Sequence, residues 1–159
     1  MGGDDLFTVL LLNTQTGTTS EQTIRAGQGG TVSLGAELQP LATLPVVVRG
    51  TVGFKFVGTA ADDANLYFTR VPLELVASVR HASGAHAGAG AVAHVFNRLR
   101  GDGLLRDTDF DPAVGVVVEA GWKALAVRYT VLTYRADTGD RFAASAPGLS
   151  ATYRWTPGR

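Results

Sequence analysis

Residues 113–135, AVGVVVEAGWKALAVRYTVLTYR, contain two alternating strands with almost no connection between them. Gly121-Trp122 predicts a tight type II′ turn, because glycine readily adopts the positive φ that the first turn position needs. With this turn Val118 faces Leu125, and the large apolar side chains of both strands share one face. The other face is small or charged and comprises Gly115, Val117, Glu119, Ala124, Ala126 and Arg128. The stretch therefore predicts a β-hairpin with two very different faces.

The composition fits one domain, residues 1–159, without a strong net charge or a disulfide framework. The 14 Lys and Arg residues balance 14 Asp and Glu, so the net charge does not favour nucleic-acid binding. There is no cysteine for a disulfide or a thiolate metal site. No apolar run approaches the roughly 18 residues of a membrane helix, although a transmembrane strand needs only about 9 to 11. The chain opens Met-Gly-Gly-Asp-Asp without a signal peptide, so an exported protein would be a processed form.

Alternating strands recur along the chain and predict an all-β fold. The eight expected strands lie at residues 6–12, 21–41, 46–56, 66–81, 85–96, 113–120, 123–135 and 142–155. We expect a kink at Gly29-Gly30, and a bulge or break at Pro72, since proline donates no ladder hydrogen bond. The expected connections alternate in length, being long at 13–20, 58–65 and 100–112, short at 42–45, 82–84 and 121–122, and medium at 136–141. This alternation predicts an eight-stranded antiparallel up-and-down β-barrel with both termini at the short-turn rim.

The polar face of these strands carries about one charged residue or histidine per strand. The inward candidates are Glu37, Arg49, Lys55, Arg70, Glu74, Arg80, His94, Glu119, Arg128 and Arg154. Glycine and alanine separate them, as the crowded interior of an eight-stranded barrel requires. We expect a lumen charge network of Glu37, Arg49, Lys55, Glu74, His94, Glu119, Arg128 and Arg154. The aliphatic face then points outward into lipid, which makes the barrel transmembrane; a soluble barrel with its charges outside is the alternative.

Aromatic residues on the aliphatic face favour the same orientation. They lie toward strand ends, where membrane barrels carry girdles of aromatic side chains at the two lipid interfaces. The expected aromatic girdle comprises Phe54, Phe56, Tyr67, Trp122, Tyr129, Tyr153 and Trp155. The sequence thus predicts an apolar outer band with an aromatic border.

Five segments carry a resemblance to a known class of proteins. They are TIRAGQGG (23–30), RVPLELVASVR (70–80), AHVFNRLRGDG (93–103), DFDPAVGVVVEAGW (109–122) and GLSATYRW (148–155). From about Asp4 onward the chain resembles small eight-stranded outer-membrane β-barrel proteins of Gram-negative bacteria, in particular a set of uncharacterised proteobacterial ones. The resemblance implies a location in the bacterial outer membrane and no particular activity. Such barrels commonly end on an aromatic assembly signal; Trp155 would take this role, followed by four further residues.

His81 and Ser83 form the arrangement that most suggests an enzyme. An H-x-S pair resembles the outer-membrane lipid A deacylases, in which His and Ser act together with a carboxylate. Here Gly84 follows the serine, whereas those enzymes usually have Asn, and the pair falls at a tight turn. We therefore predict that the protein is not an enzyme and has no catalytic residue.

Two further groups of residues suggest acid/base or metal chemistry. His94 with Glu74 or Glu119 would suit a general acid/base or a weak metal pair, but a histidine hydrogen-bonded within the lumen network is the favoured interpretation. The aspartates of the longest connection are Asp102, Asp107, Asp109 and Asp111. They lack the fixed glycine and terminal glutamate of an EF-hand, which favours a solvated loop. We expect no metal and no cofactor.

The favoured function is a non-enzymatic integral outer-membrane β-barrel, with a structural or interaction role and a lumen filled by side chains. The alternatives are a narrow, porin-like pore that favours anions and a soluble lipocalin-like barrel that binds a small hydrophobic ligand. The expected partner is the lipid bilayer, the barrel is expected to be a monomer, and the sequence identifies no ligand. The regular AGAGAVA pattern at residues 87–93 is also compatible with an engineered sequence.

Overall fold

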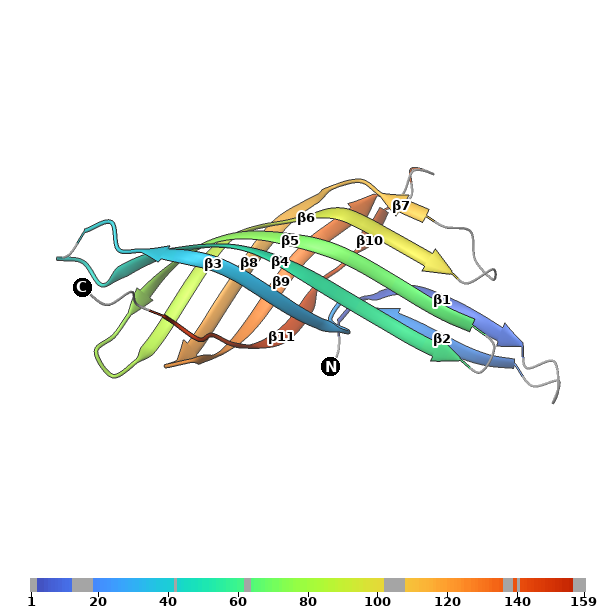
Figure 1. Ribbon diagram of the computed structural model, residues 1–159, viewed down its shortest axis with the longest axis horizontal. Helices are drawn as coiled ribbons and strands as arrows, with labels where there is room; N and C mark the ends of the chain where they lie inside the picture. Colours follow the sequence, from blue (N-terminus) through green and yellow to red (C-terminus); the bar gives the residue numbers. More distant parts are fainter. Residues whose placement is uncertain are drawn as a thin grey trace.

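The computed structural model describes residues 3–12, 19–41, 43–61, 64–101, 108–135, 139 and 141–155, and its regular elements are β-strands (Figure 1). The strands are β1 (Asp5–Leu12), β2 (Thr19–Arg25), β3 (Gly30–Leu38), β4 (Val46–Ala61), β5 (Ala64–Arg80), β6 (Ala85–Gly101), β7 (Thr108–Phe110), β8 (Ala113–Trp122), β9 (Leu125–Arg135), β10 (Arg141–Ala143) and β11 (Ala146–Ala151). In the described part of the chain, no helix has the length and hydropathy of a membrane span. The predicted all-β class is confirmed.

Nine strands form one antiparallel sheet that curls into a half-barrel (Figure 1). Its hydrogen-bonded order is β10-β9-β8-β6-β5-β4-β3, with β11 also on β9 and β7 also on β6. β1 and β2 pair separately in a two-stranded sheet. Among the described residues, no ladder joins β3 to β11. The hydrogen bonds therefore build a strongly curved sheet, and they do not close it into the expected ring.

Two of the eight expected strands are broken into two segments each, and the short strand β7 precedes a third. Residues 26–29 separate β2 from β3, and Gly29 has a φ of 88°, so the expected kink is confirmed. β7 and β8 both pair with β6, and β10 and β11 both pair with β9. Each of these pairs occupies the place of one barrel strand. The last segment ends at Ala151, so the strand expected to continue to Trp155 is too long.

Two of the expected long connections contain strand. β4 continues to Ala61 and β5 begins at Ala64, and these two residues pair, so the loop expected at 58–65 is wrong. β6 continues to Gly101, and β7 lies inside the connection expected at 100–112. The hydrogen bonds between paired strands are made by backbone groups. The polar side chains of these segments predicted loops, but they do not prevent the strands from continuing beyond the apolar rows.

The hairpin at residues 113–135 turns two residues later than expected. Trp122 pairs with Leu125, so Lys123-Ala124 form the turn, and Lys123 has the positive φ of 53°. The expected pair of Val118 with Leu125 is therefore wrong. Gly121 lies in β8, where the opposing carbonyl oxygen leaves no room for a Cβ atom. A shift of two residues preserves the alternation, and so both faces are those predicted.

Pro72 interrupts the ladder in the middle of β5. The pairing of β4 with β5 stops after Val52–Leu73 and resumes at Lys55–Arg70, with no change of register. Proline has no N–H to donate, and the ladder lacks the two pairs Gly53–Pro72 and Phe54–Val71, so the expected local break is confirmed. The side chain of Pro72 is buried on the inner face.

A β-bulge on β6 lies opposite Arg70. The register with β5 shifts there, so Arg70 opposes both Phe96 and Asn97. Phe96 has a positive φ of 52° and is exposed, whereas Asn97 is buried. Before the bulge the even-numbered residues of β6 are the buried ones, and after it the odd-numbered residues are. The bulge therefore switches the faces of the strand and turns Asn97 and Leu99 inward.

The aliphatic face of the curled sheet is on the outside. On β8, Val114 and Val116 expose 72% and 57% of their surface, whereas Val117 exposes 1% and Glu119 5%. The interior contains a buried apolar cluster, which comprises Ala26, Val57, Phe68, Val76, Val92, Leu99, Phe110, Ala113, Val117, Leu132, Tyr134, Ala144 and Ala146. Charged side chains lie beside this cluster. This arrangement reverses that of a soluble sandwich, in which the aliphatic rows form the core.

Asp4 connects the two borders of the curled sheet. Its N–H donates to the carbonyl oxygen of Ser145 (2.9 Å), and its own carbonyl accepts from the N–H of Ala26 (2.9 Å). Its carboxylate also accepts from the N–H of Ser145 (2.8 Å). Ala26 lies between β2 and β3, and Ser145 lies between β10 and β11. One residue therefore hydrogen-bonds to both ends of the sheet.

Candidate functional site

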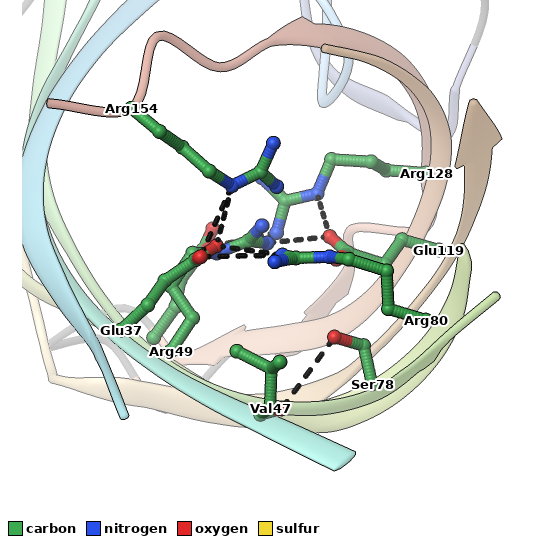
Figure 2. Close-up of polar contacts among 9 residues, drawn as sticks. Glu37, Val47, Arg49, Ser78, Arg80, Glu119, Arg128 and Arg154 are labelled. Carbon is green, nitrogen blue, oxygen red and sulfur yellow. Dashed lines mark hydrogen bonds and ion pairs between the residues drawn. The ribbon is translucent and has the colours of Figure 1, made fainter. Parts of the chain in front are cut away.

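The charged residues predicted for the lumen lie on the inner face of the half-barrel. Figure 2 shows Glu37, Arg49, Glu119, Arg128 and Arg154 pointing toward one another from strands around the curve. Their burial increases from the rim inward: Arg154 is exposed, Glu37, Arg49 and Arg128 are partly buried, and Glu119 is buried. The fold therefore gathers side chains that are far apart in the sequence.

Glu119 and Glu74 each form an ion pair with an arginine on a strand that is not a neighbour in the sheet. Arg49 Nη2 on β4 lies 2.6 Å from Glu119 Oε2 on β8, and Arg128 Nη2 on β9 lies 2.6 Å from Glu74 Oε2 on β5. Arg128 Nε also lies 3.4 Å from Glu119 Oε2. In the order of the sheet, two strands separate the partners of each 2.6 Å pair. Only a strongly curled sheet brings such residues together.

Glu37 on β3 forms a second ion-pair group at the short-turn end. Its Oε2 accepts from Arg80 Nη2 (3.2 Å) and from Arg154 Nε (3.0 Å). Arg154 follows β11, so this pair joins side chains from opposite ends of the sheet (Figure 2). The three side chains are 23% to 32% exposed, and water screens their attraction more than it does at Glu119.

A third group, which we call the cation–tyrosine cluster, comprises Lys55, Arg70, His94 and Tyr134. Arg70 Nη1 donates to the hydroxyl of Tyr134 (2.9 Å), and the same hydroxyl contacts Nδ1 of His94. Lys55 Nζ donates to the backbone carbonyl of Ala26 (3.2 Å). The predicted residues Lys55 and His94 therefore take part in a group that has no carboxylate among its described contacts, and not in the Glu–Arg network.

Aromatic rings cover the cation–tyrosine cluster on one side. The Cζ atom of Arg70 lies 4.5 Å from the centroid of the Phe68 ring, a cation–π distance. Phe68, Phe110 and Tyr134 contact one another edge to face, with centroids 5.7 to 6.4 Å apart. Phe142 lies 6.3 Å from Phe110. The loop end of the interior is therefore filled by aromatic side chains.

Several buried polar atoms in the interior have no hydrogen-bond partner. Among the described residues they are Arg70 Nε and Nη2, Asn97 Oδ1, Glu119 Oε1 and Arg128 Nε. Arg128 Nε and Glu119 retain their ion-pair partners. Arg70 differs from them, because two donors of a guanidinium that is 1% exposed face no acceptor. A buried charge normally acquires a counter-charge.

The residues predicted for the aromatic girdle are all exposed. Phe54, Phe56, Tyr67, Trp122, Tyr129, Tyr153 and Trp155 expose between 41% and 90% of their surface. Trp122 and Trp155 lie at the short-turn end, and Tyr67 lies near the loop end of β5. Phe54 and Tyr129 lie in the middle of β4 and β9. The expected position near strand ends is therefore wrong for these two residues.

The candidate catalytic pair lies at an exposed turn. His81 Nδ1 lies 2.9 Å from Ser83 Oγ, and both residues are exposed between β5 and β6. The described contacts give this pair no carboxylate partner, which a nucleophilic triad requires. That the protein is not an enzyme stays a prediction.

The aspartate loop is described only in part. Asp102 and Asp107 lie outside the described residues, Asp109 pairs with Arg100 at 3.2 Å, and Asp111 is exposed. Within the described residues, no group of three or more His, Asp or Glu side chains has a metal-binding arrangement.

Sequence reasoning missed the aromatic part of the interior. Phe68 and Tyr134 share the strand parity of the charges Arg70 and Arg128, so alternation alone could have placed them inside. Alternation could not place Asn97 inside, because the bulge at Phe96 changes the inward-facing residues of β6 from even-numbered to odd-numbered ones. Arg70 was an inward candidate, yet the expected network did not include it.

Comparison of the chain with protein families, with curated proteins and with solved structures gives no match.

Proposed function

We propose that the protein is an integral outer-membrane β-barrel of eight strand passes, non-enzymatic, with a structural or interaction role and a lumen filled by side chains. The observation that supports this most is the polarity of the curled sheet. Large apolar side chains are exposed on its outer face, and paired charges are enclosed on its inner face. Soluble monomers rarely expose contiguous apolar patches larger than a few hundred Å². In the hydrocarbon core of a bilayer, these apolar side chains would contact lipid and not water.

The lengths of the outer apolar rows also suit a bilayer. On β5 the outward row runs from Val71 to Val79, and on β8 it runs from Val114 to Trp122. Each row has about the 9 to 11 residues with which a tilted strand crosses the hydrocarbon core. β4 and β5 continue past these rows toward the loop end, with 16 and 17 residues in total. The additional residues would extend into water.

Insertion into lipid vesicles tests the proposal. Leu75, 59% exposed, lies within the outer row of β5, and Leu75→Arg should cost about 2 to 4 kcal/mol of unfolding free energy in vesicles. Thr133→Arg is the matched control, because Thr133 is exposed on β9 beyond the last outward valine, and it should cost about 0 to 1 kcal/mol. Equal effects of both variants, or a monodisperse wild type without detergent, would contradict membrane insertion.

A narrow pore that favours anions is the second candidate. The described interior cations are Arg49, Lys55, Arg70, Arg80, Arg128 and Arg154, and the described carboxylates are Glu37, Glu74 and Glu119. This excess of positive charge favours anions if water passes through the lumen. The aromatic filling at Phe68 and Phe110 argues for a plug. Steady anion-selective current across a planar bilayer would reverse the order of the two candidates. The soluble lipocalin-like alternative needs the aliphatic face inside, whereas these side chains are exposed.

A further inference from the structure

Arg70 is a buried cation with unused hydrogen-bond donors. Its side chain is 1% exposed, and Nη1 donates to Tyr134. Nε and Nη2 have no partner and no access to solvent. Leaving a buried donor unpaired costs about 1 to 3 kcal/mol, and more when the group is charged. The residues that the structure describes supply no acceptor for these two donors.

The neighbours of Arg70 add positive charge and donors. Lys55 lies directly opposite Arg70 in the β4–β5 ladder, and like charges in this position repel each other. The Tyr134 hydroxyl accepts from Arg70 and also hydrogen-bonds to Nδ1 of His94.

Among the described interior carboxylates, none forms an ion pair or a hydrogen bond with Arg70 or Lys55. Glu119 pairs with Arg49 and Arg128, and Glu74 also pairs with Arg128. Glu37 pairs with arginines at the short-turn end. Within the described residues, no negatively charged group therefore pairs with Arg70.

We propose that the interior binds a small inorganic anion of halide size between Arg70 and Lys55, with Nε and Nη2 of Arg70 as its donors. The Phe68 ring over the guanidinium limits the space, which excludes bulky anions. A singly charged ion also loses less hydration energy on burial than a multiply charged oxyanion does. The proposal does not depend on membrane insertion, since the same interior exists in either environment.

Bromide is a suitable probe, because its anomalous scattering locates it directly. Crystals of the wild type grown in sodium bromide should show an anomalous peak within hydrogen-bond distance of Arg70 Nε or Nη2. In solution, replacing gluconate by bromide at constant ionic strength should raise the urea midpoint of the wild type and then saturate, as site binding requires. Gluconate serves as the reference because it is too large for the site.

Two variants separate the site from general salt effects. Arg70→Met removes the proposed donors and should abolish the bromide-dependent shift. Arg80→Gln should retain it, because Arg80 lies in the Glu37 group and Glu37 still has Arg154 as a partner. The proposal fails if the wild-type midpoint does not respond to bromide, if both variants respond like the wild type, or if the density at Arg70 is water. Should Arg70→Met not fold, the crystallographic result on the wild type decides alone.

Discussion

Glu119 shows how a carboxylate can be kept inside this sheet. Its side chain is 1% exposed, and arginines from β4 and β9 approach it. Burying a carboxylate is costly unless charges and hydrogen bonds surround it. Two cations for one carboxylate meet that condition, and they also join strands on different sides of the curve. The residue is therefore both an electrostatic centre and a structural cross-link.

We expect Glu119→Ala to destabilise the protein by about 3 to 5 kcal/mol, because it leaves the partly buried Arg49 without a counter-charge. Arg49 is the best second substitution, since Glu119 is its ion-pair partner, whereas Arg128 also serves Glu74. The double variant with Arg49→Met should recover part of the loss. Urea unfolding of the two single variants and the double variant gives the coupling energy.

The exposed pair of Asp5 and Arg25 is the control for this cycle. Its side chains are 61% and 49% exposed, so Asp5→Ala should cost no more than about 1 kcal/mol. A Glu119→Ala variant as stable as Asp5→Ala would mean that the interior is hydrated, and the proposed filled lumen would then be wrong.

At the scale of the strands, inward glycines allow neighbouring backbones to approach closely. At Gly90 and Gly115, a Cβ atom would meet the carbonyl oxygens of Leu75 and Val131 on the next strand. Glycine in a strand commonly marks a bend or a close approach of another backbone. These positions lie on the inner face of the sheet. Small residues there allow the sheet to curl around the charged side chains.

Gly115→Ala should therefore destabilise the protein by about 1 to 3 kcal/mol, the usual effect of forcing extra atoms into a packed site. Gly50→Ala is the matched control, because a Cβ atom at Gly50 has nothing within 4 Å. It should be neutral or stabilising by up to about 1 kcal/mol, since alanine restricts the unfolded chain. The measurement is the unfolding midpoint of both variants in the same detergent. Similar midpoints would show that close approach at Gly115 does not limit the fold.

Alternation made the faces of the strands predictable from the sequence, and it did not make their pairing predictable. The hairpin turn lies two residues later than the sequence predicts, yet Val118 and Tyr129 lie on the predicted outer face. A two-residue shift is invisible to a pattern of period two. Strand occupies described parts of the loops expected at 58–65 and 100–112 for a related reason. Side-chain polarity indicates exposure to water, and a strand can continue into water.

The charged interior was predictable to the same extent. The alternation of inward and outward residues predicted that Glu37, Glu74 and Glu119 lie on the inner face, where arginines contact them in the structure. Alternation could not show which charges join the Glu–Arg groups and which join the cation–tyrosine cluster. That division depends on how far from the short-turn end of the curled sheet each side chain lies. The position of Arg70 along the curled sheet depends on the strand register and on the bulge opposite it. Both are defined only by the assembled strands.

At the scale of the whole molecule, the described hydrogen bonds leave a sheet with two borders. Side chains and one residue outside the ladders bring these borders together: Arg154 reaches Glu37 at the short-turn end, and Asp4 bonds to Ala26 and Ser145. Unpaired borders expose backbone groups that favour pairing with other chains. The hydrogen bonds of Asp4 therefore help to hold the two borders together.

Asp4→Ala removes the carboxylate that accepts the N–H of Ser145, a hydrogen bond to a charged group worth about 1.5 to 3 kcal/mol, while both backbone bonds of residue 4 can remain. We expect the unfolding free energy to fall by about that amount, and Asp4→Asn, which keeps an acceptor oxygen, to lose less. Hydrogen exchange gives the local test. The amides of Ala26 and Ser145 should exchange faster in Asp4→Ala, whereas the amide of Val117, buried in the centre of the sheet, should change only with global stability. If the three amides accelerate equally, Asp4 contributes to overall stability alone and the borders are held together elsewhere.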